Sequence, residues 1–475
     1  MLKTLLVVVL TLSAAAQSPQ LSPEARQYVK YAQPITIITH VRVIDGTGKP
    51  ALEDQTVFIQ NGKISADVLG IAGGVNAIDG TGYTVIPGIV GMHDHMYYPA
   101  PRVNPAAKEA LYPEHASSFP KFYLAGGVTT IRTTGSVEPY TDLELKKAID
   151  AGKLPGPKIH VTGPYLEGVG SFTLQMHELK DAEDARNTVN YWISEGATSF
   201  KAYMHITPAE LKAAIETAHA HHLKITGHLC SIGFKEAAAL GIDDLEHGLF
   251  VDTEFDPAKQ PGLCPSTPGA ASTVLNKLDA NGPELQGLIK DLVAHHVALT
   301  STLPVFETSV PGRASMEQRV LDAMLPEART QYLQIRERVA KTPNSPWPKL
   351  FKLEEDFEYE FVKQGGTLLA GLDPTGYGGV IAGYGDQREI ELLVEAGFTP
   401  IEAIHIATMN GAKFLEEDRQ IGSIEQGKAA DLVLIKGDPS KNIKDIENVE
   451  VVFKDGVGYD SAKLIQAANG TVGLR

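Results

Sequence analysis

The chain has 475 residues, 43% of them hydrophobic, and a formal net charge of −16 from 42 Lys and Arg against 58 Asp and Glu. A chain of this length and composition can bury at least one large core, so an intrinsically disordered protein is not expected. The negative charge repels polyanions, and no cluster of Lys and Arg reverses it locally. We therefore expect no nucleic-acid partner.

The first residues are typical of an export signal. Lys3 precedes an apolar run over 5–12, and small residues at 13–16 provide a cleavage site before Gln17. The run is too short to span a bilayer. A buried N-terminal helix is the alternative, and the lack of a polar face disfavours it. We expect a signal peptide over 1–16, a secreted or periplasmic protein, and no membrane association after its removal.

Both ends of the remaining chain have a β-rich pattern. Residues 35–86 contain short strand-like runs and the hairpin turn signal Asn61-Gly62, and the same pattern returns over 421–456. Chain ends in compact proteins often lie close together, which predicts one composite domain. The predicted divisions are a β-sandwich domain over 33–86 and 417–465, and a barrel domain over 87–416.

The middle of the chain alternates strand-like and helix-like segments. Eight apolar runs are separated mostly by amphipathic stretches of helix length, and they cover 84–92, 128–134, 158–163, 199–204, 224–229, 243–247, 297–303 and 367–372. Eight such units predict an α/β fold of the (β/α)₈ TIM barrel type. The segments near 250–297 and 313–365 exceed what one connecting helix needs, so we interpret them as insertions that wall or cover the site.

Six polar residues stand where these runs end: His93, His95, Lys201, His228, His247 and Asp373. The carboxyl ends of barrel strands meet at one face, so these side chains are expected to converge there. Residues two apart on a strand point the same way, so His93 and His95 can present two imidazoles to one cation. A lone His-x-His is as well explained by an ordinary polar strand end. The four further candidates favour a metal site.

Several motifs carry a resemblance to a known family. They lie at 87–95, 200–203, 227–228, 246–248, 371–374 and 422–434. Together they resemble the metal-dependent amidohydrolase superfamily, and within it the imidazolonepropionase-like and Xaa-Pro-dipeptidase-like members. The likeness spans roughly 35–456, and it is specific for the superfamily but not for the substrate.

The resemblance implies that Lys201 is N6-carboxylated. A protonated amine cannot be a metal ligand, whereas a buried neutral amine that has captured CO₂ becomes a carbamate whose two oxygens can bridge two divalent ions. The spacing alone permits this modification without requiring it. A salt-bridged or snorkelling lysine is the alternative.

The resemblance also assigns roles to the other ligands. His228 and His247 would hold the second ion, while Asp373 would contact the first and act as general acid and base. A turn or capping role before Pro374 is the alternative for Asp373. Nitrogen and carboxylate donors suit Zn²⁺ best and leave Mn²⁺, Fe²⁺ and Co²⁺ open. Tyr203 faces the same side as Lys201 and is the one predicted substrate contact.

Three positions depart from the family pattern. Leu372 replaces the usual small hydroxyl residue before the catalytic Asp, and the second strand over 129–135 lacks the Asp often found near its end. Ser231 stands where the mononuclear deaminase branch typically has a Glu. Nucleobase deamination is therefore disfavoured.

We expect an exported binuclear hydrolase that cleaves an amide bond in a small molecule, a dipeptide or an N-acyl amino acid. A lactonase or phosphotriesterase with the same ions is one alternative, and a secreted metal-containing binding protein without catalysis is another. Cys230 and Cys264 could pair in an oxidising compartment, although a small unpaired core residue is the preferred interpretation of Cys230. Homo-oligomer formation stays open.

Overall fold

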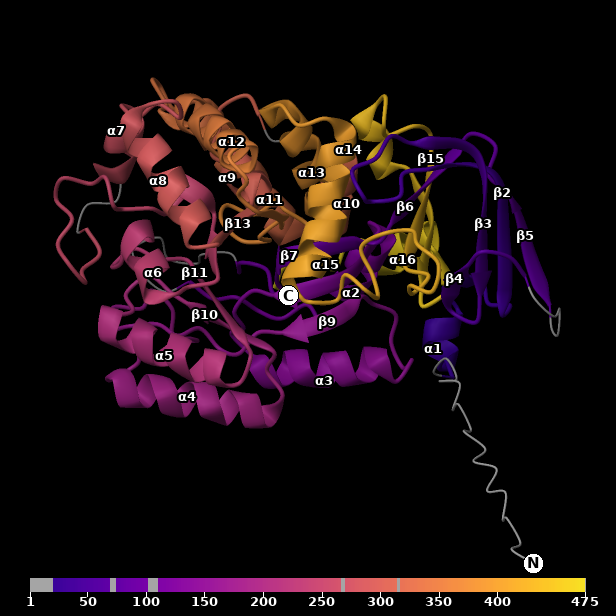
Figure 1. The fold of residues 1–475 in the computed structure, drawn as a ribbon, viewed down its shortest axis with the longest axis horizontal. Helices are drawn as coiled ribbons and strands as arrows, with labels where there is room; N and C mark the ends of the chain where they lie inside the picture. Colours follow the sequence, from indigo (N-terminus) through magenta and orange to yellow (C-terminus); the bar gives the residue numbers. More distant parts are fainter. Residues whose placement is uncertain (1–19, 69–73, 101–109, 266–269, 314–316, 475) are drawn as a thin grey trace, which may run out of the picture.

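The computed structural model describes residues 20–68, 74–100, 110–265, 270–313 and 317–474. The predicted signal peptide over 1–16 lies outside these ranges. A β domain lies at one side and a larger barrel domain at the other (Figure 1). This arrangement confirms the predicted fold class.

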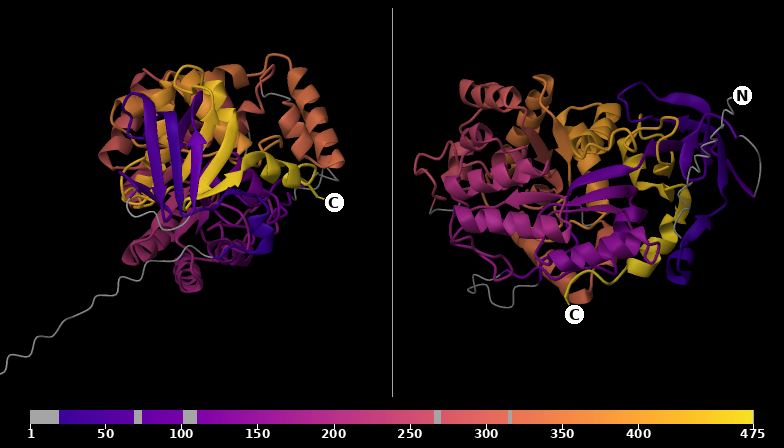
Figure 2. Two further views of the ribbon diagram at one scale, coloured as in Figure 1. Left: turned by 90° about the vertical axis from the view of Figure 1, so that its right-hand side faces the viewer. Right: turned by 60° about the horizontal axis from the view of Figure 1, so that its bottom comes forward.

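The β domain joins the two ends of the chain in one sheet. Its nine strands run in the order β1-β17-β16-β15-β6-β2-β3-β4, with β5 paired to β2. They are β1 (Val29–Tyr31), β2 (Ile35–Val43), β3 (Leu52–Gln60), β4 (Lys63–Ser65), β5 (Val75–Asp79), β6 (Tyr83–Pro87), β15 (Leu432–Lys436), β16 (Val449–Lys454) and β17 (Val457–Asp460). Antiparallel pairing of β15 with β6 makes the junction, and the early and late strands lie side by side in the left panel of Figure 2.

The interior of the β domain is a separate apolar cluster. It includes Ile38 and Val57 from the N-terminal part, and Leu432, Val451 and Phe453 from the C-terminal part, all buried. Alternating apolar residues place one face of each strand in this core. Neither end can bury its apolar face alone, so the domain requires both.

The barrel contains eight parallel strands. They are β7 (Ile89–Asp94), β8 (Val128–Thr133), β9 (Lys158–Val161), β10 (Ser199–Ala202), β11 (Lys224–Gly227), β12 (Asp244–Glu246), β13 (Ala298–Ser301) and β14 (Leu368–Ala370). The run β7-β8-β9 meets the run β10 to β14 through a parallel bridge between Thr162 and Ser199. The Asp373 N–H donates to the His93 carbonyl at 3.0 Å and links the last strand to the first.

The first predicted run needs a correction. Residues 84–92 are not one barrel strand: β6 belongs to the sheet of the β domain and β7 to the barrel. Gly88 separates them, and a Cβ there would lie 2.0 Å from the Thr129 hydroxyl oxygen. Only glycine fits where the chain passes so close to Thr129. The uninterrupted apolar run over 84–92 therefore supplies one strand to each of two sheets.

Helices surround the barrel strands on the outside. The principal ones are α2 (Phe119–Ala125), α3 (Pro139–Asp150), α4 (Ala182–Glu195), α5 (Pro208–Ala220), α6 (Phe234–Leu240), α8 (Pro283–Ala294), α12 (Trp347–Lys363) and α13 (Tyr384–Ala396). Helix α5 shows why a helix begins where it does. The Thr207 side chain accepts from the Glu210 N–H, the Glu210 carboxylate accepts from the Thr207 N–H, and Pro208 follows the cap.

The remaining helices are short or belong to connections. They are α1 (Pro23–Arg26), η1 (Gly248–Phe250), α7 (Ala270–Leu275), α9 (Leu303–Glu307), α10 (Gln318–Ala323), α11 (Pro326–Ala340), α14 (Pro400–His405), η2 (Ile406–Asn410), α15 (Gly411–Phe414), η3 (Ile443–Glu447) and α16 (Ser461–Ala468). The stretch predicted as an insertion over 313–365 contains α10, α11 and α12. Helix α12 directly precedes β14 and is the connecting helix of that barrel unit. Helices α10 and α11 are therefore the insertion.

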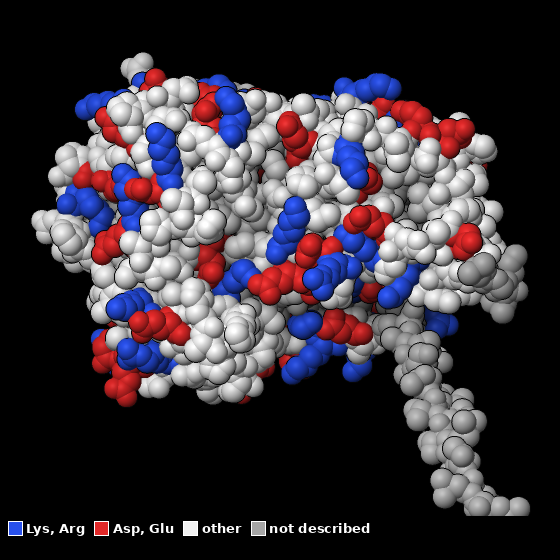
Figure 3. Space-filling model, viewed as in Figure 1, with Lys and Arg blue, Asp and Glu red and all other residues white. Residues whose placement is uncertain are grey.

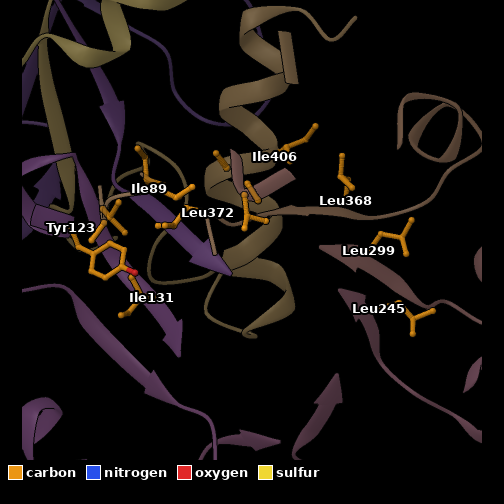
Figure 4. Packing of buried hydrophobic residues seen from close by; sticks show 14 of the residues in the cluster. Ile89, Tyr123, Ile131, Leu245, Leu299, Leu368, Leu372 and Ile406 are labelled. Atoms are coloured by element: carbon orange, nitrogen blue, oxygen red, sulfur yellow. The ribbon is translucent and has the colours of Figure 1, made fainter. Parts of the chain in front are cut away.

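The barrel core lies between strands and helices. Figure 4 shows Ile89 and Ile131 from neighbouring strands near Tyr123 of α2, with Leu372 and Ile406 beside them. No helix among the described residues is both long and apolar enough to cross a membrane. On the face shown in Figure 3, basic side chains are interspersed with acidic ones.

Candidate metal centre

All six candidate residues lie at the carboxyl ends of barrel strands. His93 and Lys201 are inside β7 and β10, and the others follow the ends of β7, β11, β12 and β14. Five of the six are buried, at 0 to 7% exposure: His93, His95, Lys201, His247 and Asp373. His228 is half-buried.

Three imidazoles face one carboxylate. The Nε2 atoms of His93 and His95 lie 3.8 Å from the Asp373 carboxylate oxygens, and Nε2 of His247 lies 3.9 Å from one of them. These separations are too long for hydrogen bonds. Two donors that are each about 2.1 Å from one ion lie about 3 to 4 Å apart, so the spacing suits atoms that share a cation.

The other nitrogen of two of these rings is fixed by a neighbour. Nδ1 of His93 lies 2.6 Å from the Glu246 carboxylate, and Nδ1 of His247 lies 2.7 Å from the Thr302 hydroxyl. An ionised carboxylate only accepts, so Nδ1 of His93 carries the proton and its Nε2 keeps a lone pair. Burial holds the pKa of His93 and of His247 well below the usual value, so both rings stay neutral and able to bind a metal.

His228 lies beside His247 and Tyr203. Its ring centroid is 4.6 Å from that of His247 and 4.8 Å from that of Tyr203. Burial lowers the pKa of His228 to about 3, with a further contribution from Lys201. The structure therefore brings a fourth neutral imidazole to the same face, beside the residue predicted to contact substrate.

Lys201 is buried without a carboxylate partner at salt-bridge distance among the described residues. Its Nζ lies 3.3 Å from Nε2 of His93, and 5.6 and 5.9 Å from the ring centroids of Tyr165 and Tyr203. Burial lowers the pKa of Lys201 to about 8. A salt-bridged or snorkelling lysine does not match this environment.

Asp373 has a backbone conformation that few residues adopt. Its φ is +48°, and that of His247 is +69°, both in the left-handed region. The Thr375 hydroxyl donates to Oδ1 of Asp373 at 2.8 Å. Burial raises the pKa of Asp373 to about 6, although Lys201 opposes the rise. Asp and His adopt this region more readily than most residue types, and several other described residues share it.

Behind the imidazoles lies a buried ion pair that the sequence motifs did not identify. Nη2 of Arg132, from β8, donates to the Glu246 carboxylate at 2.8 Å and to the Met92 carbonyl at 2.8 Å. Burial raises the pKa of Glu246, but Arg132 and Lys201 bring it below the usual value. An arginine within the strand-like run at β8 and a glutamate next to His247 were the available signals. Arg132 lies in the same run, 129–135, that lacks the Asp of the family pattern.

An aromatic cluster covers one side of the site. Tyr97 stacks on His95 with centroids 4.4 Å apart, and its hydroxyl bonds to that of Tyr165. The Tyr165 ring is 4.7 Å from that of Tyr203, and Phe172 packs nearby. Tyr203 is thus placed beside the ligands, as a substrate contact requires. Its contact with substrate stays a prediction.

The two cysteines form a disulfide, with Cα atoms 4.9 Å apart. The preferred interpretation of Cys230 as an unpaired residue is therefore wrong. The bridge ties the loop around Cys264 to the segment that follows His228. Next to it, the buried Ser231 hydroxyl donates to the Ile206 carbonyl. Ser231 stands at the position where the deaminase pattern has a Glu.

The donor set fits a metal ion. Atoms of His93, His247 and Asp373 all lie within 4.8 Å of one another and are buried. Neutral imidazole and carboxylate donors, with Glu246 and Thr302 fixing two of the rings, suit a divalent transition metal. His95, His228 and Lys201 surround this group.

The chain is similar to known proteins in sequence and in fold. Over 74 residues the chain is 36% identical to an adenine deaminase from Clostridium botulinum (strain Loch Maree / Type A3), which is 14% of this chain and 12% of that protein. The chain thus matches only a small part of that relative's length.

Solved structures match far more of the chain. A Xaa-Pro dipeptidase with bound methionine in its active site superimposes with a TM-score of 0.65 at 23% identity, covering 90% of this chain and 100% of that one. A prolidase complexed with N-methylphosphonate-L-proline gives a TM-score of 0.63 at 18% identity, with 90% and 99% covered. At these identities the likeness shows the fold. The sequence model of the amidohydrolase family matches residues 84–297 and 378–458, more than half of the chain. The chain belongs to the amidohydrolase family.

Proposed function

We propose that the protein is a binuclear metal-dependent hydrolase that cleaves an amide bond in a dipeptide or an N-acyl amino acid. The observation that carries the proposal is the convergence of three imidazole Nε2 atoms on the Asp373 carboxylate at 3.8 to 3.9 Å. Family membership and the structural likeness to a Xaa-Pro dipeptidase and a prolidase support the amide bond as the target.

The residues present would hold two divalent ions, for which Zn²⁺ is the best match. His93, His95 and Asp373 would bind one ion, and His228 and His247 the other. When bound, such ions lower the pKa of water and polarise a carbonyl group. The Thr302 and Glu246 contacts keep the imidazoles oriented for this task.

Lys201 would bridge the two ions as a carbamate. Its position 3.3 Å from Nε2 of His93, in a buried site without a carboxylate partner at salt-bridge distance among the described residues, is unfavourable for an ammonium group. Reaction of the neutral amine with CO₂ forms an N–C bond and releases a proton, which converts the side chain into an anion. That charge suits a position between two cations.

Asp373 would move the proton during hydrolysis. It takes a proton from the attacking water and delivers it to the leaving nitrogen, so that the amine departs as a neutral group. Thr375 orients the carboxylate through the 2.8 Å hydrogen bond to Oδ1. Tyr203, whose ring lies 4.8 Å from that of His228, would contact the substrate.

A substrate panel tests the proposal. The Zn²⁺-loaded protein is assayed with dipeptides, N-acyl amino acids, a lactone and a phosphotriester, beside the Asp373→Asn variant. We expect amide hydrolysis by the wild type and its loss in the variant. Faster turnover of the lactone or phosphotriester would assign a different electrophile. If the metal-loaded protein hydrolyses nothing and Asp373→Asn still binds ligand, a binding protein is the better description.

Export is part of the proposal. The export-type residues at 1–16 support it, and the pairing of Cys230 with Cys264 favours an oxidising compartment. N-terminal sequencing of protein recovered from the periplasm or medium should begin at Gln17. Recovery of the uncut chain from the cytoplasm alone would contradict export.

A further inference from the structure

A cavity of about 610 Å³ lies between α11 and the segments that follow β7 and β14. Tyr98 and Ala100 come from the first segment, and Gly376 to Gly378 from the second. Helix α11 supplies the opposite wall. It belongs to the stretch 313–365 that the sequence predicted to wall or cover the site.

The cavity begins where two candidate ligands end. Tyr98 is three residues beyond His95, and Gly376 is three residues beyond Asp373. Three extended residues span at most about 10 Å, so both walls start within that distance of the ligands. The Gly379 N–H donates to the Tyr98 hydroxyl at 2.7 Å and joins the two segments. On the other side Tyr112 lines the cavity and packs against Tyr97, which stacks on His95. Both walls of the cavity are therefore continuous along the chain with segments that supply candidate metal ligands.

The cavity has a mixed lining of apolar and polar side chains, with a single charged residue among those described. Tyr332, Ile335 and Val339 of α11 face it, and Arg338 is the one charged residue among its described lining residues. The Arg338 guanidinium has no hydrogen bond or ion pair with another described side chain, whereas the adjacent Glu337 pairs with Lys341. In a chain with a net charge of −16, a guanidinium without a described partner, beside a cavity whose described lining contains no carboxylate, favours an anion.

We infer that this cavity binds the carboxylate-bearing amino-acid part of the substrate, with Arg338 pairing to the carboxylate and the α11 and tyrosine side chains contacting an apolar side chain. The inference rests on the proposed amide hydrolysis, and it narrows the substrate class. A guanidinium binds a carboxylate through two parallel hydrogen bonds, a geometry that neutral ends of a molecule cannot reproduce. Substrates with a free α-carboxylate and a bulky apolar residue should be preferred over their carboxamides.

Arg338→Ala tests the charge. N-acetyl-L-phenylalanine and N-acetyl-L-phenylalanine amide serve as probes, with KM and kcat measured on the Zn²⁺-loaded enzyme and affinity measured by calorimetry. We expect Arg338→Ala to weaken binding of the free acid about 10- to 100-fold, through KM, and to leave kcat and the carboxamide unchanged. Arg338→Lys should keep part of the preference for the free acid over the carboxamide. Arg329→Ala removes the same charge from α11 outside the cavity lining and should behave as wild type.

A size variant tests the apolar wall. Ile335→Trp fills the cavity and should weaken binding of N-acetyl-L-phenylalanine more than that of N-acetylglycine. If the ratio of the affinities for the two acids is unchanged in the variant, the cavity does not contact the substrate's apolar side chain.

The outcomes separate this inference from the proposed function. If Arg338→Ala keeps the full preference for the free acid while amides are still hydrolysed, the inference is overturned and the activity stands. If no amide is hydrolysed but calorimetry shows binding of the free acid that depends on Arg338, the hydrolase proposal fails and the carboxylate site remains. Equal binding of acid and carboxamide by the wild type also overturns the inference.

Discussion

The Glu246 carboxylate lies 2.6 Å from Nδ1 of His93, although the two residues are 153 positions apart in the sequence. Arg132 holds the other Glu246 oxygen at 2.8 Å. Each of the three comes from a different barrel strand, and each is fully buried. The Arg132–Glu246 ion pair thus fixes the orientation of the His93 ring. Only the folded barrel places Glu246 beside that ring.

Glu246→Gln should weaken metal binding. The amide keeps the size of the side chain but removes the charge that keeps Nδ1 of His93 protonated, and loss of such partners typically costs 10- to 100-fold in affinity. Zinc retention against a competing chelator measures the effect. Glu210→Gln changes another buried glutamate, which caps α5, and should retain zinc as wild type does. Equal retention by the Glu246 variant would show that the contact does not support a ligand.

Arg132→Met should destabilise the fold. It leaves the Glu246 and Asp244 carboxylates buried without their cation, and breaking a buried ion pair costs about 3 to 5 kcal/mol in the free energy of unfolding. Urea unfolding of the metal-free protein gives the value without the contribution of bound ions. Lys146→Met breaks a surface pair with Asp150 and should have a much smaller effect. Similar losses in both variants would contradict a special role for Arg132.

Lys201→Ala should lose metal and activity together, because it removes the proposed bridging carbamate. A short carboxylate such as acetate should restore part of both. Metal content by elemental analysis and turnover with and without acetate are the measurements. Lys428→Ala removes another buried lysine, which donates to the Ser423 hydroxyl near the β domain, and should keep both metals. Two metals and full turnover in the Lys201 variant would rule out the bridging role.

Removing the disulfide should lower stability. Cys230 and Cys264 close a loop of 34 residues, for which chain entropy gives about 3 to 4 kcal/mol. Cys264→Ser should therefore unfold at lower urea concentration than the wild type. Reductant should shift the wild type to the midpoint of the variant and leave the variant unchanged. A wild-type midpoint that does not respond to reductant would contradict the bridge.

The buried His115 should make the protein less stable in acid. Burial lowers its pKa to about 4 from 6.5, so the unfolded chain takes up a proton below pH 6.5 that the folded chain refuses until about pH 4. Stability should fall across this window, by about 3 kcal/mol in total, and the contribution is constant below it. His115→Phe, which can stack on Phe119 as the imidazole does, should flatten the pH dependence of the unfolding midpoint between pH 6.5 and pH 4. An unchanged slope would mean that other groups cause the loss.

Much of the fold was predictable because its signals are local. Apolar runs bounded by polar residues indicated the barrel strands, and the Asn61-Gly62 turn marked a hairpin, where β3 does meet β4. The division at Gly88 was not predictable, because apolar residues continue through it and only the partners of β6 and β7 differ. Pairing of Cys230 with Cys264 likewise depended on how the loop between them folds back.

By itself the sequence determined which side chains stand at strand ends and could meet, since the alternation of strands and helices directs all carboxyl ends to one face. Only the tertiary structure decided what surrounds them: the Arg132 and Glu246 pair behind His93, and the cavity between α11 and the segments that follow β7 and β14. The physical reason is that the position of a metal-ligating side chain at a strand end follows from the alternation of strands and helices along the chain. The charge and shape around it are set by residues from distant segments, which contact one another only after the barrel has closed.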